Sequence, residues 1–207
     1  TGGTPPYRWD LDYQFTEIDS TQSFPMISSQ QISTSSTDDG WAMKVLDFEF
    51  PYYGEKYDTI FVHNDGFIMF RDESIEWIYD KSLELMFTFH KCIAPYFCDL
   101  KYSGSNGIWY EGNSNSATFR WNAYVSGQSG SEVNFAAKLF PSGDIEFYYG
   151  DISLSSNEIW YAGLSKGDKR IYQTIDVSNT FSPSPNYMVK LISPKFPIEL
   201  KLSHDGI

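Results

Sequence analysis

The strongest constraint on the fold is a period of two in the apolar residues of the stretch SGSEVNFAAKLFPSGDIEFYYGDI, positions 129 to 152. Its alternating apolar residues are Val133, Phe135, Ala137 and Leu139 before the Pro-Ser-Gly-Asp turn and Ile145, Phe147 and Tyr149 after it. This period is typical of strands with one buried face, and Pro and Gly suit a tight reversal. The stretch predicts a β-hairpin, so Asp144, Glu146 and Asp151 are interpreted as hairpin residues before they are interpreted as a catalytic group.

Similar segments recur along the whole chain, separated by Gly, Ser, Asn and Asp turns. The predicted strands are 7–15, 41–50, the two halves of a strand-turn-strand over 59–70, 87–93, 107–111, 117–125, 131–140, 145–150, 158–164, 170–176, 187–192 and 196–202. The apolar phase changes within 41–50, which indicates a bulge. Residues 28–40 are interpreted as a loop in which Ile32 anchors a short strand, and residues 72–86 are the one predicted helix.

Short strands at this spacing predict an all-β fold, an antiparallel β-sandwich of jelly-roll-like or immunoglobulin-like type. We expect one domain over residues 1–207, because no repeat or linker is visible in the sequence. Apolar residues make up 41% of the chain and aromatic residues 18%, which is enough for a large core and favours strands.

The charge and the chain start narrow the possible partners and location. A net charge of -12 argues against nucleic acid and anionic membranes, which need clustered Lys and Arg. No apolar run is long enough to span a bilayer, and residue 1 lacks the features of a signal peptide. We therefore expect a mature or excised piece of a longer protein. The two cysteines, Cys92 and Cys98, are too few for a disulfide scaffold, and a local bridge between them is left open.

Two kinds of catalytic site have partial matches in the sequence. The segment GLSKG, which contains Ser165, has the form of a nucleophile elbow, but it lies between two predicted strands instead of a strand and a helix. A glycosidase needs two carboxylates across a cleft, and acids are spread over all the loops. We expect no enzymatic activity.

Calcium is the one cofactor that the sequence leaves open. The candidate ligands are Asp38, Asp39, Asp65 and Asp99, because calcium accepts scattered loop carboxylates. No D-x-D-x-D-G loop is present, and acids at turns usually cap backbone N–H groups. No other cofactor is expected.

Adjacent aromatic residues are candidates for a carbohydrate platform. Trp109-Tyr110, Tyr148-Tyr149 and Trp160-Tyr161 each place two rings on opposite sides of one strand, so one ring of each pair is expected in the core. The candidate ligand-binding residues are Trp109, Tyr110, Tyr148 and Trp160. The alternatives are that the exposed rings cover a sheet face or an interface.

Several phrases between residues 38 and 168 resemble one family. They are DDGWAMKVLDFEFPYYGEKYDTIFVHNDGFIMF, IAPYFCDL, NGIWYEGNSNSATFRWNAYV, VNFAAKLFPSGDIEFYYGDI and YAGLSKGD. In this order they resemble a β-sandwich module of secreted bacterial proteins, often attached to subtilisin-like proteases. The nidogen-like segment of plexin-domain-containing (tumour endothelial marker) membrane proteins shares the order.

The resemblance implies an extracellular, non-catalytic module for adhesion, recognition or spacing, with a protein or glycan partner at the cell surface or matrix. The leading alternative is a carbohydrate-binding module attached to a secreted hydrolase. Cys98 departs from the family pattern, because it stands where the first of two acids is usual and leaves Asp99 alone. The family phrases are strand ends and turns, so the loops at 28–40, 102–107 and 126–131 are expected to carry function.

Overall fold

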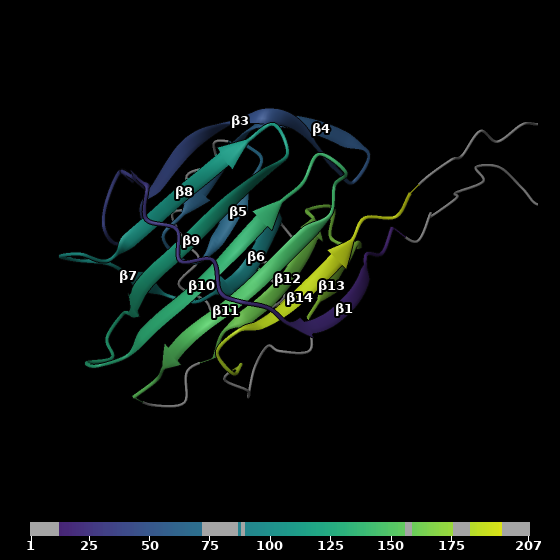
Figure 1. The fold of residues 1–207 in the computed structure, drawn as a ribbon. Helices are drawn as coiled ribbons and strands as arrows, with labels where there is room; N and C mark the ends of the chain where they lie inside the picture. Colours follow the sequence, from purple (N-terminus) through teal and green to yellow (C-terminus); the bar gives the residue numbers. More distant parts are fainter. Residues whose placement is uncertain (1–12, 72–86, 88–89, 156–158, 176–182, 196–207) are drawn as a thin grey trace, which may run out of the picture.

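Two antiparallel sheets pack face to face in the computed structural model (Figure 1), which describes residues 13–71, 87, 90–155, 159–175 and 183–195. This arrangement confirms the predicted all-β sandwich. Strands of the two sheets run roughly along the same direction in Figure 1, as in an aligned sandwich. In the part of the chain that the structure describes, no helix is of a length and hydropathy that would cross a bilayer. The helix predicted for 72–86 lies outside the described residues.

The larger sheet has eight strands in the order β1-β14-β11-β10-β9-β8-β2, with β7 also paired to β9. These strands are β1 (Thr16–Thr21), β2 (Gln30–Ile32), β7 (Leu100–Lys101), β8 (Gly107–Asn113), β9 (Ser116–Val125), β10 (Glu132–Leu139), β11 (Ile145–Ser153) and β14 (Tyr187–Ile192). The hairpin predicted at the start is the β10-β11 pair, in which Leu139 faces Ile145 across the turn.

The smaller sheet has six strands in the order β13-β12-β6-β5-β4-β3. They are β3 (Trp41–Tyr52), β4 (Glu55–His63), β5 (Phe67–Met69), β6 (Lys91–Phe97), β12 (Tyr161–Lys166) and β13 (Tyr172–Thr174). The bulge predicted in 41–50 is confirmed, because the register of β3 against β4 shifts between Val45 and Phe50. The predicted turn over Asn64, Asp65 and Gly66 joins β4 and β5.

Several strand predictions are wrong in their bounds. Those at 145–150 and 158–164 are β11, Ile145–Ser153, and β12, Tyr161–Lys166, and the two largest differences are at 7–15 and 87–93. Of the strand predicted at 7–15, residues 13–15 are not in a strand, and β1 begins at Thr16; residues 7–12 lie outside the described part. The N–H of Phe15 donates to Oε1 of Gln173 over 3.0 Å instead of to a neighbouring strand. The strand predicted at 87–93 is β6, Lys91–Phe97. It is buried on both faces, so it lacks the alternation that marks the other strands. The strand predicted at 196–202 lies outside the described residues.

A column of stacked rings joins the two sheets. Trp121 of β9 stacks on Phe135 of β10 with ring centroids 5.2 Å apart, and Phe135 stacks on Tyr96 of β6 at 5.0 Å. Tyr96 stacks in turn on Trp160 at 4.3 Å. The indole Nε1–H of Trp121 also donates to the His63 carbonyl over 2.8 Å. Because Trp121 lies on the larger sheet and Tyr96 and His63 on the smaller, this column fixes how the sheets sit on each other.

A strap, residues 22–29, crosses the outer face of the larger sheet. It connects β1 and β2, which lie at opposite edges of that sheet (Figure 1, dark purple). Arg120 holds it: the guanidinium donates from Nη1 to the Ile27 carbonyl over 3.0 Å and from Nε to Oδ1 of Asn134 over 2.9 Å. Burial lowers the pKa of Arg120. The strap therefore occupies the sheet face above β9, β10 and β11, and a ligand on this side must bind beyond it.

Candidate functional site

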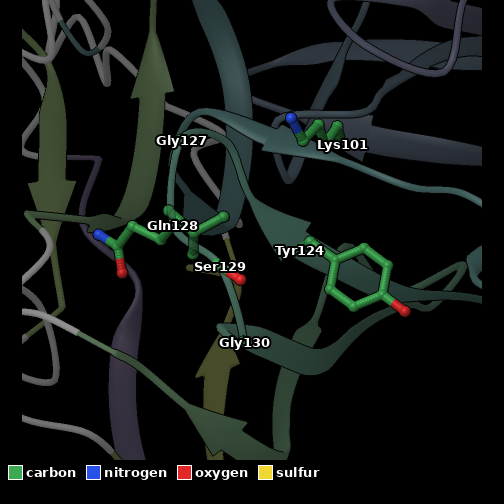
Figure 2. A pocket seen from close by; sticks show the side chains of 7 residues that line it. Lys101, Tyr124, Gly127, Gln128, Ser129 and Gly130 are labelled. Carbon is green, nitrogen blue, oxygen red and sulfur yellow. The ribbon is translucent and has the colours of Figure 1, made fainter.

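A pocket of about 320 Å³ lies where β7 and β9 meet the turn that leads into β10. We call it the turn-end pocket; its lining residues are Lys101, Tyr124, Val125, Gly127, Gln128, Ser129 and Gly130. Figure 2 shows Lys101 and Tyr124 on one side and the Gly127–Gly130 turn on the other. The turn belongs to the 126–131 loop in which the sequence predicts function. This volume is at the small end of the usual range for ligand pockets, about 300–1,000 Å³.

The turn is fixed by its own hydrogen bonds. Gln128 N–H donates to the Val125 carbonyl over 3.2 Å, and Ser131 N–H donates to the Gln128 carbonyl over 3.4 Å. The Ser131 hydroxyl donates to Oε1 of Gln128 over 2.8 Å and accepts from Ser155 N–H over 2.8 Å. Gly127 and Gly130 have positive φ angles of 74° and 83°, which glycine adopts without a steric penalty. The turn therefore holds a defined shape although it is exposed.

Several polar groups of the pocket have no hydrogen-bond partner among the residues that the structure describes. In the described part of the chain, the N–H groups of Gly127, Ser129 and Gly130 and the Ser129 hydroxyl make no hydrogen bond. Lys101 and Tyr124 are directly opposed in the β7-β9 pair, so their side chains project on the same face. Neither the ring nor the hydroxyl of Tyr124 contacts another ring or polar group of the described residues.

The four aromatic residues that the sequence suggests for ligand binding, by contrast, already contact other side chains of the protein. The Arg120 guanidinium lies 5.1 Å from the Trp109 ring centre. Nζ of Lys44 lies 3.7 Å from the Tyr110 ring centre. The Tyr148 hydroxyl donates to Oε2 of Glu146 over 2.5 Å. Trp160 is 1% exposed and is part of the ring column.

One ring of each predicted pair does enter the core, as expected from strand geometry. The buried members are Tyr110, Tyr149 and Trp160, and their neighbours Trp109, Tyr148 and Tyr161 are partly exposed. The structure therefore leaves Trp109 and Tyr148 as the accessible members of the predicted platform. They lie on β8 and β11, with β9 and β10 between them, and they do not line the turn-end pocket.

The predicted calcium ligands gather at one end of the sandwich without forming a metal site. Asp38 makes a β-bridge to Lys101, beside the pocket. The pKa of Asp38 is raised, chiefly by partial burial, with Asp39 and Asp99 adding and Lys101 opposing. Across residues 13–71, 87, 90–155, 159–175 and 183–195, however, no group of three or more His, Cys, Asp or Glu side chains is placed to hold a metal ion.

Asp65 is buried below these surface acids and beside a buried histidine. Its Oδ1 accepts from Leu100 N–H over 2.8 Å, and its Oδ2 lies 3.5 Å from Nδ1 of His63. Burial lowers the pKa of His63 to about 4, and Nδ1 accepts the N–H of Asp65, so the imidazole is neutral. Burial raises the pKa of Asp65 well above its usual range; the Leu100 N–H opposes this shift, while Asp39, Asp99 and Asp38 add to it.

We expect the Asp65→Asn variant to gain stability over the wild type as pH rises. A carboxyl whose pKa is raised by folding contributes stability that is present below its unfolded pKa, about 3.8, and is lost as pH rises. Asn keeps an acceptor for Leu100 N–H and cannot ionise. Urea unfolding at pH 4, 6 and 8 should show an advantage that grows with pH, whereas the exposed control Asp151→Asn should show none. An advantage that is constant or falls with pH would contradict the buried placement of Asp65.

Other residue types that catalysis uses have structural roles. The Ser165 hydroxyl is fully buried in β12, donates to the Phe87 carbonyl over 2.6 Å and accepts from Gly167 N–H over 3.0 Å. Asp144 accepts from Ser193 N–H over 3.0 Å, and Glu146 pairs with Lys190 over 3.3 Å. Cys92 and Cys98 are both buried and neither is in a disulfide, so the local bridge does not form in this structure.

Lys101 and Tyr124 are pocket residues that sequence reasoning missed. Lys101 lies in the two-residue strand β7 and Tyr124 lies near the end of β9. Nothing in the sequence distinguishes them from other surface residues. The available signal is the glycine-rich SGQSGS segment at 126–131, which the sequence predicts to be a functional loop. The residues that line a pocket with this segment depend on which strands lie beside it in the fold. Lys101 lies there because β7 pairs with β9, which the sequence does not predict.

The family model described as NIDO related matches residues 12–193, which is most of the chain. A search of curated proteins returned no match. A search of solved structures also returned no match.

Proposed function

This chain belongs to the NIDO-related family, and we propose that it is an extracellular binding or adhesion module of a larger secreted or cell-surface protein. Family membership supports an extracellular nidogen-like module. The partner would be a protein or a glycan at the cell surface or in the matrix, and the module would work without catalysis of its own.

The observation that carries this proposal is the turn-end pocket. It is a concave surface whose turn is held by hydrogen bonds of its own residues, and several of its other polar groups have no partner among the described residues. Such a surface on a rigid scaffold suits recognition, because little freedom is lost when a partner binds. The acidic surface, with a net charge of -12, favours partners other than nucleic acid.

The burial and the hydrogen bonds of the Ser165 hydroxyl support a non-catalytic role. This hydroxyl lies in the core and already donates to a carbonyl, so it has no free path to a substrate. We expect a fluorophosphonate probe to leave the chain unlabelled. Labelling at Ser165 would contradict this part of the proposal.

A second candidate function is that of a carbohydrate-binding module attached to a secreted hydrolase. The specific observation that favours it is Tyr124, a pocket aromatic ring without a partner among the described residues. Trp109 and Tyr148, the accessible members of the predicted platform, are the alternative sugar-contacting residues.

A surface-binding assay tests the leading proposal. The fluorescently labelled chain is added to bacterial cells, animal cells and matrix preparations, before and after treatment with protease or with periodate. We expect saturable binding to at least one surface. Loss after protease indicates a protein partner, and loss after periodate a glycan. Absence of saturable binding to every surface would contradict a recognition role.

A further inference from the structure

We propose that the turn-end pocket binds one neutral pyranose unit of a glycan, with Tyr124 as the stacking ring and the 126–131 turn and Lys101 as hydrogen-bond donors. This inference rests on the proposed function and specifies the ligand of the same site.

The first support is the contrast between Tyr124 and the other candidate aromatic residues. Trp109, Tyr110, Tyr148 and Trp160 already contact a cation, a carboxylate or another ring. Tyr124 is half-buried, lines a pocket, and has neither a ring partner nor a hydrogen-bond partner among the described residues. Tyrosine presents an apolar face with a polar tip, which matches the C–H face and the hydroxyl rim of a pyranose.

The second support is the set of donors that shares the pocket lining with Tyr124. The N–H groups of Gly127, Ser129 and Gly130 and the Ser129 hydroxyl have no partner in the described chain, and Figure 2 shows the turn with Ser129 on one side of Tyr124. Apart from Tyr124, the only large apolar side chain of the lining is Val125, which is 1% exposed. A lining with many donors, one ring and little aliphatic surface suits a polyhydroxyl ligand better than an apolar peptide side chain.

The third support is the charge around the pocket, which disfavours an anion. Lys101 is the one charged lining residue. It sits across a β-bridge from Asp38, and Asp38 interacts electrostatically with Asp39 and Asp99. An anionic sugar or acidic peptide at Lys101 would therefore meet three nearby carboxylates. A neutral sugar can accept a hydrogen bond from the Lys101 ammonium without that repulsion.

The glycines keep room for the ligand. A Cβ built on Gly127 or on Gly130 meets no atom within 4 Å, so the space beside the turn is open. The volume of about 320 Å³ is small, which is consistent with one sugar unit in the pocket and the remainder of a glycan outside it.

An NMR titration of the ¹⁵N-labelled 207-residue chain tests the inference. The probes are cellobiose, lactose, mannobiose and chitobiose, with digalacturonic acid and tetraglutamate as anionic comparisons. We expect at least one neutral disaccharide to shift the amide signals of Gly127, Ser129 and Gly130. We expect its dissociation constant to change by less than about twofold when the salt concentration rises tenfold, because no ion pair is screened.

Variants identify the ring. Tyr124→Ala should weaken binding of that disaccharide at least about tenfold, equivalent to about 1.4 kcal/mol, and Tyr124→Phe should weaken it less, because the stacking face remains. Tyr172→Ala, on an exposed tyrosine of β13 in the other sheet, is the matched control and should bind like the wild type. Chemical shifts outside the pocket verify that each variant is folded.

Three outcomes would overturn the inference. They are the absence of any shift at the turn with all four neutral probes, unchanged binding by Tyr124→Ala, and tighter, salt-sensitive binding of either anionic probe. The proposed function is tested separately by the surface-binding assay. If saturable surface binding persists in Tyr124→Ala, the module recognises its partner elsewhere and only this inference is wrong.

Discussion

Replacing Trp121 with alanine is expected to lower the free energy of unfolding by about 4–5 kcal/mol. Trp121 is fully buried at the end of the ring column that joins the two sheets, and it stacks on Phe135 at 5.2 Å. Its removal leaves a large cavity between the sheets. It also leaves the His63 carbonyl without the 2.8 Å hydrogen bond from the indole, and a buried acceptor without its donor costs about 1–3 kcal/mol.

Trp121→Phe separates the two contributions. It keeps a ring against Phe135 and removes the N–H donor, so its loss should be about 1–3 kcal/mol. Trp109→Ala, which removes the same side chain from the outer face of the same sheet, should cost less than either, because Trp109 is only partly buried. Urea unfolding followed by circular dichroism gives all three values. A loss below about 2 kcal/mol for Trp121→Ala would mean that the column does not join the sheets as described.

The sequence predicts strands best where apolar side chains recur at every second position. The β10-β11 hairpin shows this, because each inward residue from Val133 to Tyr149 is apolar and the turn is marked by Pro and Gly. The bulge in β3 was also visible, since a bulge shifts the apolar phase by one position. In such elements the apolar residues of the sequence pattern are also the residues that the fold buries, so the pattern is sufficient to predict the strand.

The same reasoning fails where tertiary contacts override local pattern. β6 is the clearest case, because it lies inside the smaller sheet with apolar neighbours on both faces. Residues 13–15 show the opposite error: Tyr13 and Phe15 fit a strand pattern, yet the Phe15 N–H bonds to the side chain of Gln173, 158 positions away. No local signal identifies that partner.

The candidate site could be located from sequence only as a loop. The composition of 126–131 predicts an exposed turn with functional potential, and the pocket lies there. Tyr124 and Lys101 could not be predicted, because their importance depends on the β7-β9 pairing and on the absence of other partners. Conversely, Tyr110 and Trp160 looked like surface candidates, and only the sheet geometry places both rings below 10% exposure.

Replacing Gly66 with alanine is expected to lower the free energy of unfolding by about 4 kcal/mol or more, through two effects that add. Gly66 ends the turn between β4 and β5 with φ at +78°, where an L side chain is strained by about 1–2 kcal/mol. A Cβ there would also overlap the Tyr96 carbonyl oxygen and lie 2.9 Å from the Phe135 ring. Both neighbours belong to the ring column, so neither can move without disturbing the contact between the sheets.

Gly54→Ala isolates the strain from the overlap. Gly54 has nearly the same φ, +83°, but a Cβ at that position meets no atom within 4 Å, so its loss should be about 1–2 kcal/mol. The difference between the two variants in urea unfolding therefore measures the steric effect alone. If Gly66→Ala and Gly54→Ala lose equal stability, the turn does not press against Tyr96. A large difference means instead that glycine is needed at position 66 for close packing against Tyr96 as well as for chain reversal. The Tyr96 N–H also donates to the Gly66 carbonyl over 3.4 Å, so a shift of either residue would disturb this hydrogen bond too.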